Sequence, residues 1–175
     1  TITLATDQAP TVTGAVNGET FTVTATDAIG CANSAQTIVV INPLPIVTAS
    51  NTGAYCIGDA MSVSETGVEA TSWVWTSDMG ATITNATDQA PIITAATTGE
   101  IFTVTGTDAA GCVNSAQTTI VINPLPVVTA TNSGAYCAGD AMSVSETGVE
   151  ATSWVWTSDM GATITSITDQ APTIT

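Results

Sequence analysis

The sequence predicts an all-β protein built from tandem β-sandwich repeats, and three observations predict it. Blocks of sequence recur at a fixed offset of 81 residues. Within each block, short runs of alternating apolar and polar residues are separated by Gly, Asn, Asp and Pro, which is typical of strands and turns in a sandwich. No segment of the complete block shows the 3.6-residue period of an amphipathic helix.

Two motifs define the repeat. Thr-Asp-Gln-Ala-Pro occupies Thr6–Pro10, Thr87–Pro91 and Thr168–Pro172, and Asn-Pro-Leu-Pro occupies Asn42–Pro45 and Asn123–Pro126. Aligned at this offset, the copies are identical at about four positions in five. Such regular self-similarity indicates stacked copies of one structural unit, and we expect the array to continue in both directions.

The Asn-Pro-Leu-Pro motifs are predicted to be linkers between domains. Proline supplies no N–H for sheet pairing and holds the chain extended and stiff. We therefore expect residues 1–42 to be the C-terminal half of one domain, 43–123 a complete domain and 124–175 the N-terminal half of the next. No run approaches the ~20 apolar residues of a membrane-spanning helix, and no signal peptide is present, so we interpret the chain as part of a longer protein.

The complete repeat is predicted to contain seven strands, at Ile46–Ser50, Met61–Thr66, Thr71–Thr76, Ala81–Thr84, Pro91–Ala95, Ile101–Thr107 and Ala116–Ile122. Seven short strands in about 80 residues match an immunoglobulin-like or fibronectin-like sandwich. Alternation places Phe102 and Val104 on one face of their strand. Ile93 is the expected core residue of its strand, because the preceding copy keeps an apolar Val12 there, whereas Ile92 corresponds to Thr11.

Two tryptophans are the candidate ligand-binding residues. Trp73 and Trp75 share one face of their strand, and Val74 lies on the other. Core packing is the favoured interpretation, with Trp75 at the centre of the core and Trp73 nearer an end. The alternative is an exposed aromatic platform for sugar rings.

The composition excludes several classes of function. The chain has no Lys, Arg or His against 15 acidic residues. Without cationic side chains it lacks the means to neutralise phosphates or an anionic membrane surface. It also lacks the His or Lys on which most nucleophilic catalysis depends. We therefore expect no enzymatic activity, no nucleic-acid binding and no insertion into a membrane.

Three segments carry a resemblance to a known family: Tyr55–Asp59, Ser72–Trp75 and Phe102–Cys112. Together with the Asn-Pro-Leu-Pro linker, they resemble the PKD-like and immunoglobulin-like repeats of giant surface proteins of the Bacteroidota. The usual Asp-Phe-Gly-Asp run of PKD repeats is replaced here by Trp73–Asp78, so the immunoglobulin-like branch is the closer match. The resemblance implies type IX secretion to the cell surface, and roles in adhesion, gliding or capture of other cells.

Four cysteines, two in each repeat, are expected to be oxidised in an exported protein. Their spacing lacks the paired C-x₂₋₄-C of a zinc site. A Cys56–Cys112 bond, which the resemblance also favours, would stabilise the complete repeat by about 4 kcal/mol. Immunoglobulin strand order, however, places these two loops at opposite poles, and bonded Cα atoms must lie within about 7 Å. The alternative is a bond between neighbouring repeats. Partners of Cys31 and Cys137 are expected outside this stretch.

Seven acidic positions recur in each copy, and three of them are candidate calcium ligands. Asp59 and Glu100 are expected at one pole of the domain, and Asp108 at the other, next to the preceding domain. Calcium takes about six to eight oxygen ligands, so Asp59, Glu100 and the following repeat's equivalent of Asp108 could form an interdomain site. No calcium-loop motif supports this, and the favoured role of these residues is turn formation or solubility, with no cofactor.

Two functions stay open from the sequence. The first is a structural shaft in a long extracellular filament or adhesin, whose partners are neighbouring repeats and laterally associated chains in a bundle. The second is an adhesive module, in which each repeat binds cell-surface glycans weakly and the array acts by avidity.

Overall fold

The computed structural model describes all residues, 1–175, and contains β-strands and no helix, which confirms the all-β prediction. It therefore holds no helix with the length and apolar character needed to cross a membrane. The chain forms two compact units, Thr1–Ala54 with Ala60–Val121, and Tyr55–Asp59 with Ile122–Thr175. Each unit is described by itself.

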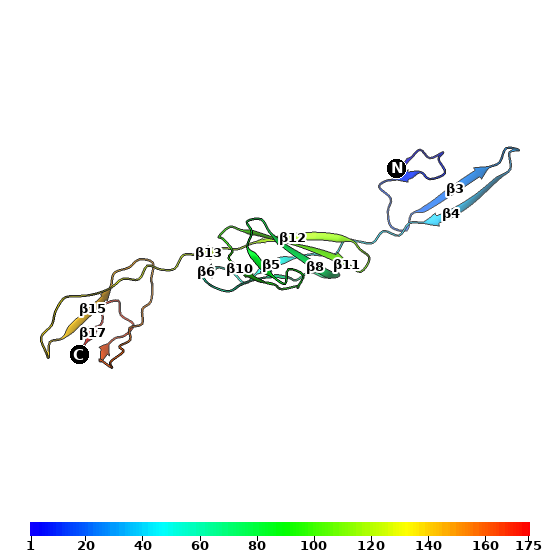
Figure 1. Ribbon diagram of the computed structural model, residues 1–175. Helices are drawn as coiled ribbons and strands as arrows, with labels where there is room; N and C mark the ends of the chain where they lie inside the picture. The colour runs from blue at the N-terminus through cyan, green and yellow to red at the C-terminus, as the bar shows by residue number, and fades with distance from the viewer. The chain divides into compact units, whose positions relative to one another are not determined.

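The first unit contains two antiparallel sheets that together resemble a sandwich, drawn in cyan to yellow-green in Figure 1. One sheet has the order β5-β7-β10-β9, with bounds Ala49–Asn51, Met61–Glu65, Ile92–Thr94 and Thr82–Thr84. The other has the order β12-β11-β8, with bounds Val113–Thr119, Ile101–Asp108 and Ala70–Ser77. The central strand β11 pairs with β12 along seven residues and with β8 along most of its length.

The first unit also contains two smaller strand pairs. β1 (Ile2–Thr3) pairs with β2 (Thr11–Val12), and β3 (Thr20–Thr26) forms an antiparallel hairpin with β4 (Ala32–Ile38).

The second unit repeats part of this architecture. Its main sheet has the order β14-β15-β17-β16, with bounds Ala130–Asn132, Met142–Glu146, Thr173–Ile174 and Ile164–Thr165. In addition, β6 (Tyr55–Cys56) pairs in parallel with β13 (Ile122–Asn123), a pairing that the sequence did not predict.

The core of the first unit comes from residues that alternate along the strands. Ile93 is fully buried, as predicted, while Ile92 is 54% exposed. Phe102 and Val104, predicted to share one face of their strand, are both fully buried. Val63 on β7 is fully buried as well. The period of two in burial follows from the pleat, which turns successive side chains to opposite faces of a sheet.

Hydrogen bonds from asparagine side chains tie β5 and the linker to β12. Asn51 Nδ2 donates to Thr118 Oγ1 at 2.7 Å and to the Thr119 carbonyl at 3.1 Å. Asn114 Nδ2 donates to the Pro45 carbonyl at 2.9 Å. Since Asn51 lies in one sheet and Thr118 in the other, these contacts join the two sheets.

Two strands begin three residues from their predicted start, while the others begin within one residue of theirs. β12 begins at Val113 instead of Ala116, because a tight turn ends directly before it: the Asp108 N–H donates to the Cys112 carbonyl, and Gly111 has a φ of 85°. β5, predicted to begin at Ile46, begins at Ala49, and Ile46 forms only an isolated bridge to Val68.

The adjacent residues Ile93 and Ile92 test the core assignment. Ile93→Ala is expected to lower the free energy of unfolding by about 2–5 kcal/mol, because it leaves a cavity in a packed core. Ile92→Ala is the matched control and should cost well under half as much, since its side chain is already largely in water. Chemical denaturation monitored by tryptophan fluorescence measures both. Equal losses for the two variants would contradict the inward assignment of Ile93.

Candidate functional site: buried carboxylates and the tryptophan strand

A buried carboxylate joins four segments of the first unit. Glu65, at the end of β7, is only 3% exposed. Its Oε1 accepts hydrogen bonds from the N–H groups of Thr48, at 3.2 Å, and Gly67. Its Oε2 accepts from Trp73 Nε1 at 3.0 Å and from Gln89 Nε2 at 3.4 Å. The carboxylate therefore connects the segment before β5, the turn after β7, strand β8 and the segment before β10.

Gly67 makes this arrangement possible. A Cβ atom at this position would overlap the Ile46 carbonyl oxygen and the Glu65 carboxylate. The same carbonyl of Ile46 accepts the Val68 N–H at 3.0 Å. The chain must pass this close to Ile46 for the turn to reach the carboxylate, and only glycine leaves room for it.

The second unit has an equivalent carboxylate. Glu146 is 4% exposed and accepts from the Thr129 N–H at 3.1 Å, the Gly148 N–H and Trp154 Nε1 at 3.0 Å. The hydrogen bond from Thr129 does most to hold the pKa of Glu146 below its usual value. Burial acts in the opposite direction, and the remaining donors outweigh it.

A further buried carboxylate belongs to Glu100, which is 1% exposed and directly precedes β11. It accepts from the Ser77 hydroxyl and from the N–H groups of Ala81 and Thr97, both at 2.8 Å. Burial by itself raises the pKa of Glu100, but the hydrogen bonds from Ser77, Thr97 and Ala81 outweigh it, so the net pKa is lowered. Glu100 therefore fixes the turn after β8 against the start of β11.

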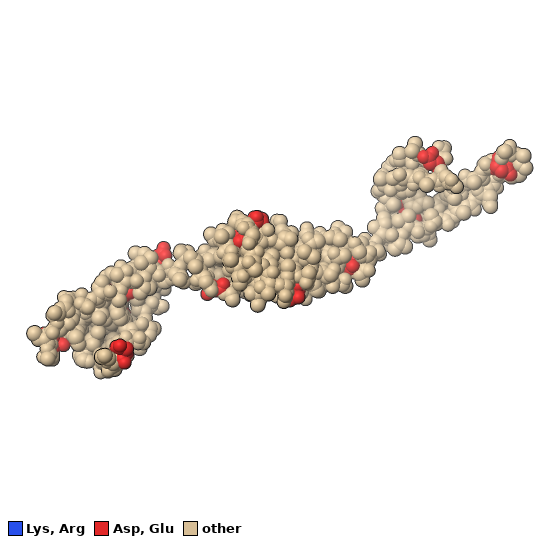
Figure 2. All heavy atoms as spheres, viewed as in Figure 1, with Lys and Arg blue, Asp and Glu red and all other residues tan.

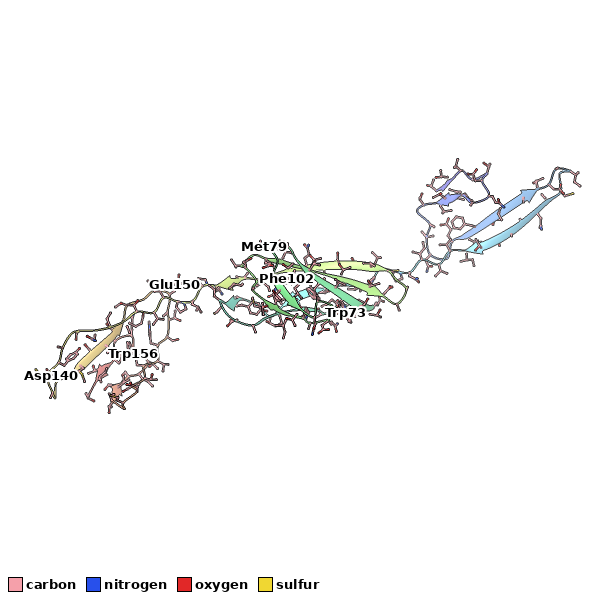
Figure 3. All side chains as sticks on the ribbon, viewed as in Figure 1. Trp73, Met79, Phe102, Asp140, Glu150 and Trp156 are labelled. Atoms are coloured by element: carbon pink, nitrogen blue, oxygen red, sulfur yellow. The ribbon has the colours of Figure 1, made fainter.

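Both candidate ligand-binding tryptophans point into the sandwich. Trp75 is 2% exposed, and its Nε1 donates to the Asp88 carbonyl at 3.1 Å. Trp73, labelled with Phe102 in Figure 3, is half-buried, and its Nε1 donates a hydrogen bond to the Glu65 carboxylate. Val74 between them is 51% exposed, so the predicted faces of the strand are confirmed. Both indole N–H groups of this repeat are used in internal hydrogen bonds.

Each of the three candidate calcium ligands accepts hydrogen bonds from backbone or side-chain donors close to it. Asp59 Oδ2 accepts from the Cys56 N–H at 2.7 Å, and Asp108 Oδ1 accepts from the N–H groups of Ala110 and Cys112. Glu100 is enclosed by its own donors. No group of three acidic, Cys or His side chains that could hold a metal ion occurs in residues 1–175. Each carboxylate instead serves the turn or strand end beside it, and Figure 2 shows the acidic atoms at separate places on the visible face.

All four cysteines are free thiols in this structure, so the expected Cys56–Cys112 bond is absent. The two cysteines have different neighbours. Cys56 is exposed and is paired with Asn123 in the β6–β13 ladder. Cys112 is half-buried, and its Sγ lies 3.9 Å from the Asn42 carbonyl oxygen. Cys31 and Cys137 are exposed.

The local setting of Cys112 affects its reactivity. Burial raises the pKa of the Cys112 thiol, and the negative charge of Asp108 raises it further. Because the thiolate is the reactive form, this thiol reacts more slowly near neutral pH than an ordinary cysteine.

A pocket of about 290 Å³ lies in the second unit, lined in part by Pro126, Glu146, Ala151, Trp154 and Trp156. The corresponding space in the first unit is filled by β11. A Cβ atom on Gly106 of that strand would lie only 2.9 Å from Val47 Cγ2 and 3.0 Å from Ala70 Cβ. No strand corresponding to β11 lies in residues 124–175. The pocket is therefore uncovered core surface.

A scan against protein-family models finds no match for this chain, and a search of curated proteins finds no similar sequence.

The buried role of Glu65 was not predicted, and Glu100 was predicted to serve in calcium binding, turn formation or solubility, whereas both carboxylates are buried. A signal for both exists in the period of two. Glu65 continues the inward series Met61 and Val63, and Glu100 precedes Phe102 and Val104 at the same spacing. Acidic residues in phase with a core face are the feature that would have identified them.

A double-mutant cycle tests the bond between Trp73 and Glu65. Trp73→Phe keeps an aromatic ring but removes the N–H, and Glu65→Gln removes the charge. Each single variant loses the same hydrogen bond to a buried charge, so the double variant should lose less stability than the two single losses added together. We expect this difference, the coupling energy, to be about 1–3 kcal/mol in the free energy of unfolding. Additive losses would show that the two side chains do not interact.

The acid stability of the protein tests Glu100. The pKa of Glu100 is lower in the folded state than its ordinary value of 4.5, which applies to the unfolded chain. The ionised carboxylate therefore stabilises the fold at pH values above that unfolded pKa. This stabilisation is lost as the pH falls through the folded pKa. Glu100→Gln should therefore be less stable at pH 7 and lose less stability between pH 5 and about pH 2. Urea denaturation across this pH range is the measurement. Glu69→Gln, at an exposed position, is the control at pH 7. Parallel pH profiles for wild type and Glu100→Gln would contradict the assignment.

Proposed function

We propose that this chain is a shaft segment of a long extracellular surface filament or adhesin, made of immunoglobulin-like repeats with a period of 81 residues. The observation that carries the proposal is that the complete repeat uses its strongest interacting groups internally. Both indole N–H groups and both buried carboxylates bind other parts of the same sandwich. Such a module is suited to holding its own shape and its distance from the next module, with no catalytic role.

The strand order supports the immunoglobulin-like assignment. Constant-type immunoglobulin domains have the strands A, B, E and D in one sheet and G, F and C in the other. The orders β5-β7-β10-β9 and β12-β11-β8 correspond to these two sheets. Backbone conformation supports the period, since Leu4, Asn85 and Ser166 all have positive φ and are spaced by the repeat offset.

The resemblance to Bacteroidota surface repeats supports export by a type IX system and a location on the cell surface. A filament of this kind would serve cell attachment, gliding or capture of other cells. The absence of Lys and Arg fits this location, because trypsin-like proteases find no cleavage site. The net charge of −15 favours solubility at high salt, where screening over a few Å limits repulsion between repeats.

A second candidate function, an adhesive repeat, is favoured by a different observation. Several aliphatic side chains of the complete repeat are more than half exposed: Ile46, Val68, Val74, Ile92 and Val113. Such side chains give weak apolar contacts with sugar ring faces or with a neighbouring chain. Many weak contacts along one array would add up through avidity.

A multivalent binding assay separates the two functions. Beads carrying the full chain are mixed with whole bacterial cells and applied to a glycan array, at seawater salt with and without calcium. The shaft proposal predicts no saturable binding in any of these conditions. Saturable binding that falls at least tenfold in the folded variants Val74→Ser or Ile92→Ser would overturn it in favour of the adhesive repeat. Thr94→Ser, on an exposed residue of β10, is the matched control.

A further inference from the structure

The two cysteines of the complete repeat each lie beside the asparagine of an Asn-Pro-Leu-Pro linker. Cys112 Sγ is 3.9 Å from the carbonyl oxygen of Asn42, in the linker that precedes the repeat. Cys56 is paired with Asn123, in the linker that follows it. The N–H of Ile57, the residue after Cys56, donates to the Asn123 carbonyl at 3.1 Å.

Asn42 and Asn123 are the same position of the repeat, at an offset of 81 residues. In a tandem array, each linker therefore receives both contacts: the Cys56 segment of the repeat before it and the Cys112 thiol of the repeat after it. One contact is made to the carbonyl oxygen of Asn123 and the other to that of Asn42, its equivalent in the preceding linker. When the two asparagines are superposed, the two distances place the Ile57 nitrogen and the incoming Sγ no more than about 7 Å apart. Because Cys56 directly precedes Ile57, both cysteines lie beside the same linker asparagine of the array, and a disulfide there requires their Cα atoms to approach within about 7 Å.

We propose that each repeat is joined to the next by a disulfide between its Cys56 and the Cys112 equivalent of the following repeat, across the Asn-Pro-Leu-Pro linker. The proposal rests on the proposed function, in that it requires a tandem array. It accounts for the four free thiols of residues 1–175, because the partner of Cys56 belongs to the second half of a following repeat and the partner of Cys112 to the first half of a preceding one.

The reaction is an ordinary thiol oxidation. The two S–H bonds break, one S–S bond forms, and two electrons and two protons pass to molecular oxygen, which becomes hydrogen peroxide. Cys56 is exposed, so the oxidant reaches it from solvent. The bond constrains a linker whose prolines already keep it extended, so it would further limit bending between neighbouring repeats.

A chain extended by one half-repeat tests the proposal. Thr175 aligns with Thr94, so adding the sequence of residues 95–123 after Thr175 completes the third repeat and adds one cysteine, equivalent to Cys112. The extended chain is oxidised in air at low concentration, digested with pepsin at acid pH without reduction, and its linked peptides are identified by mass spectrometry. Pepsin is chosen because the chain has no trypsin sites.

The expected product is a peptide pair that joins Cys56 to the added cysteine. Cys56→Ser should abolish this pair, and Cys137→Ser should leave it unchanged. Three results would each overturn the proposal: a bond from the added cysteine to Cys137, a bond from Cys56 to Cys112, or five free thiols.

The unextended chain gives an independent result. Oxidised in the same way, it should keep four free thiols per monomer by thiol titration, whereas a Cys56–Cys112 crosslink would leave two. Failure of the proposed function is recognised separately, because cell or glycan binding by the Cys56→Ser variant would contradict the shaft and leave the disulfide result unaffected.

Discussion

The fold depends on buried carboxylates whose charge no cation neutralises. The chain has no Lys, Arg or His, yet Glu65 and Glu100 are almost fully buried. An isolated charge in such a position would be strongly unfavourable, so each carboxylate must be surrounded by hydrogen-bond donors. Those donors come from segments far apart in the sequence, such as Thr48 and Trp73 for Glu65. Satisfying one charge therefore fixes the relative positions of several strands at once.

This constraint links the stability of the repeat to its proposed function. An indole that donates to a buried carboxylate is held in one orientation, and its polar edge is no longer available to a ligand. The same is true of Trp75 and the Asp88 carbonyl. The outer surface is left with hydroxyl groups, scattered acidic groups and single aliphatic side chains. A repeat of this kind is well suited to be a spacer, and any binding at its surface would have to be weak and multiplied along the array.

The linker extends the same logic from one repeat to the next. Pro43 and Pro45 restrict the backbone, while the Asn123 carbonyl accepts the Ile57 N–H and the Asn42 carbonyl lies beside the Cys112 thiol. In the proposed array each linker would carry contacts from both of its flanking repeats, and it would then allow less bending than a flexible connection of the same length. The placement of one cysteine beside each linker fits the proposed filament, in which joints as well as modules are stiff.

The sequence by itself determined the all-β class, most strand positions, the inward side chains of Ile93 and Trp75 and the common face of Phe102 and Val104, because these depend on local alternation and turn residues. The roles of Glu65 and Glu100, the start of β12 and the surroundings of the cysteines were decided only by the tertiary structure. A carboxylate in phase with a core face is interpretable from sequence only once its donors are known, and these lie up to 24 residues away in Gln89. Cys112 contacts Asn42, which lies 70 residues earlier in the sequence, and no local sequence pattern predicts a contact over that separation.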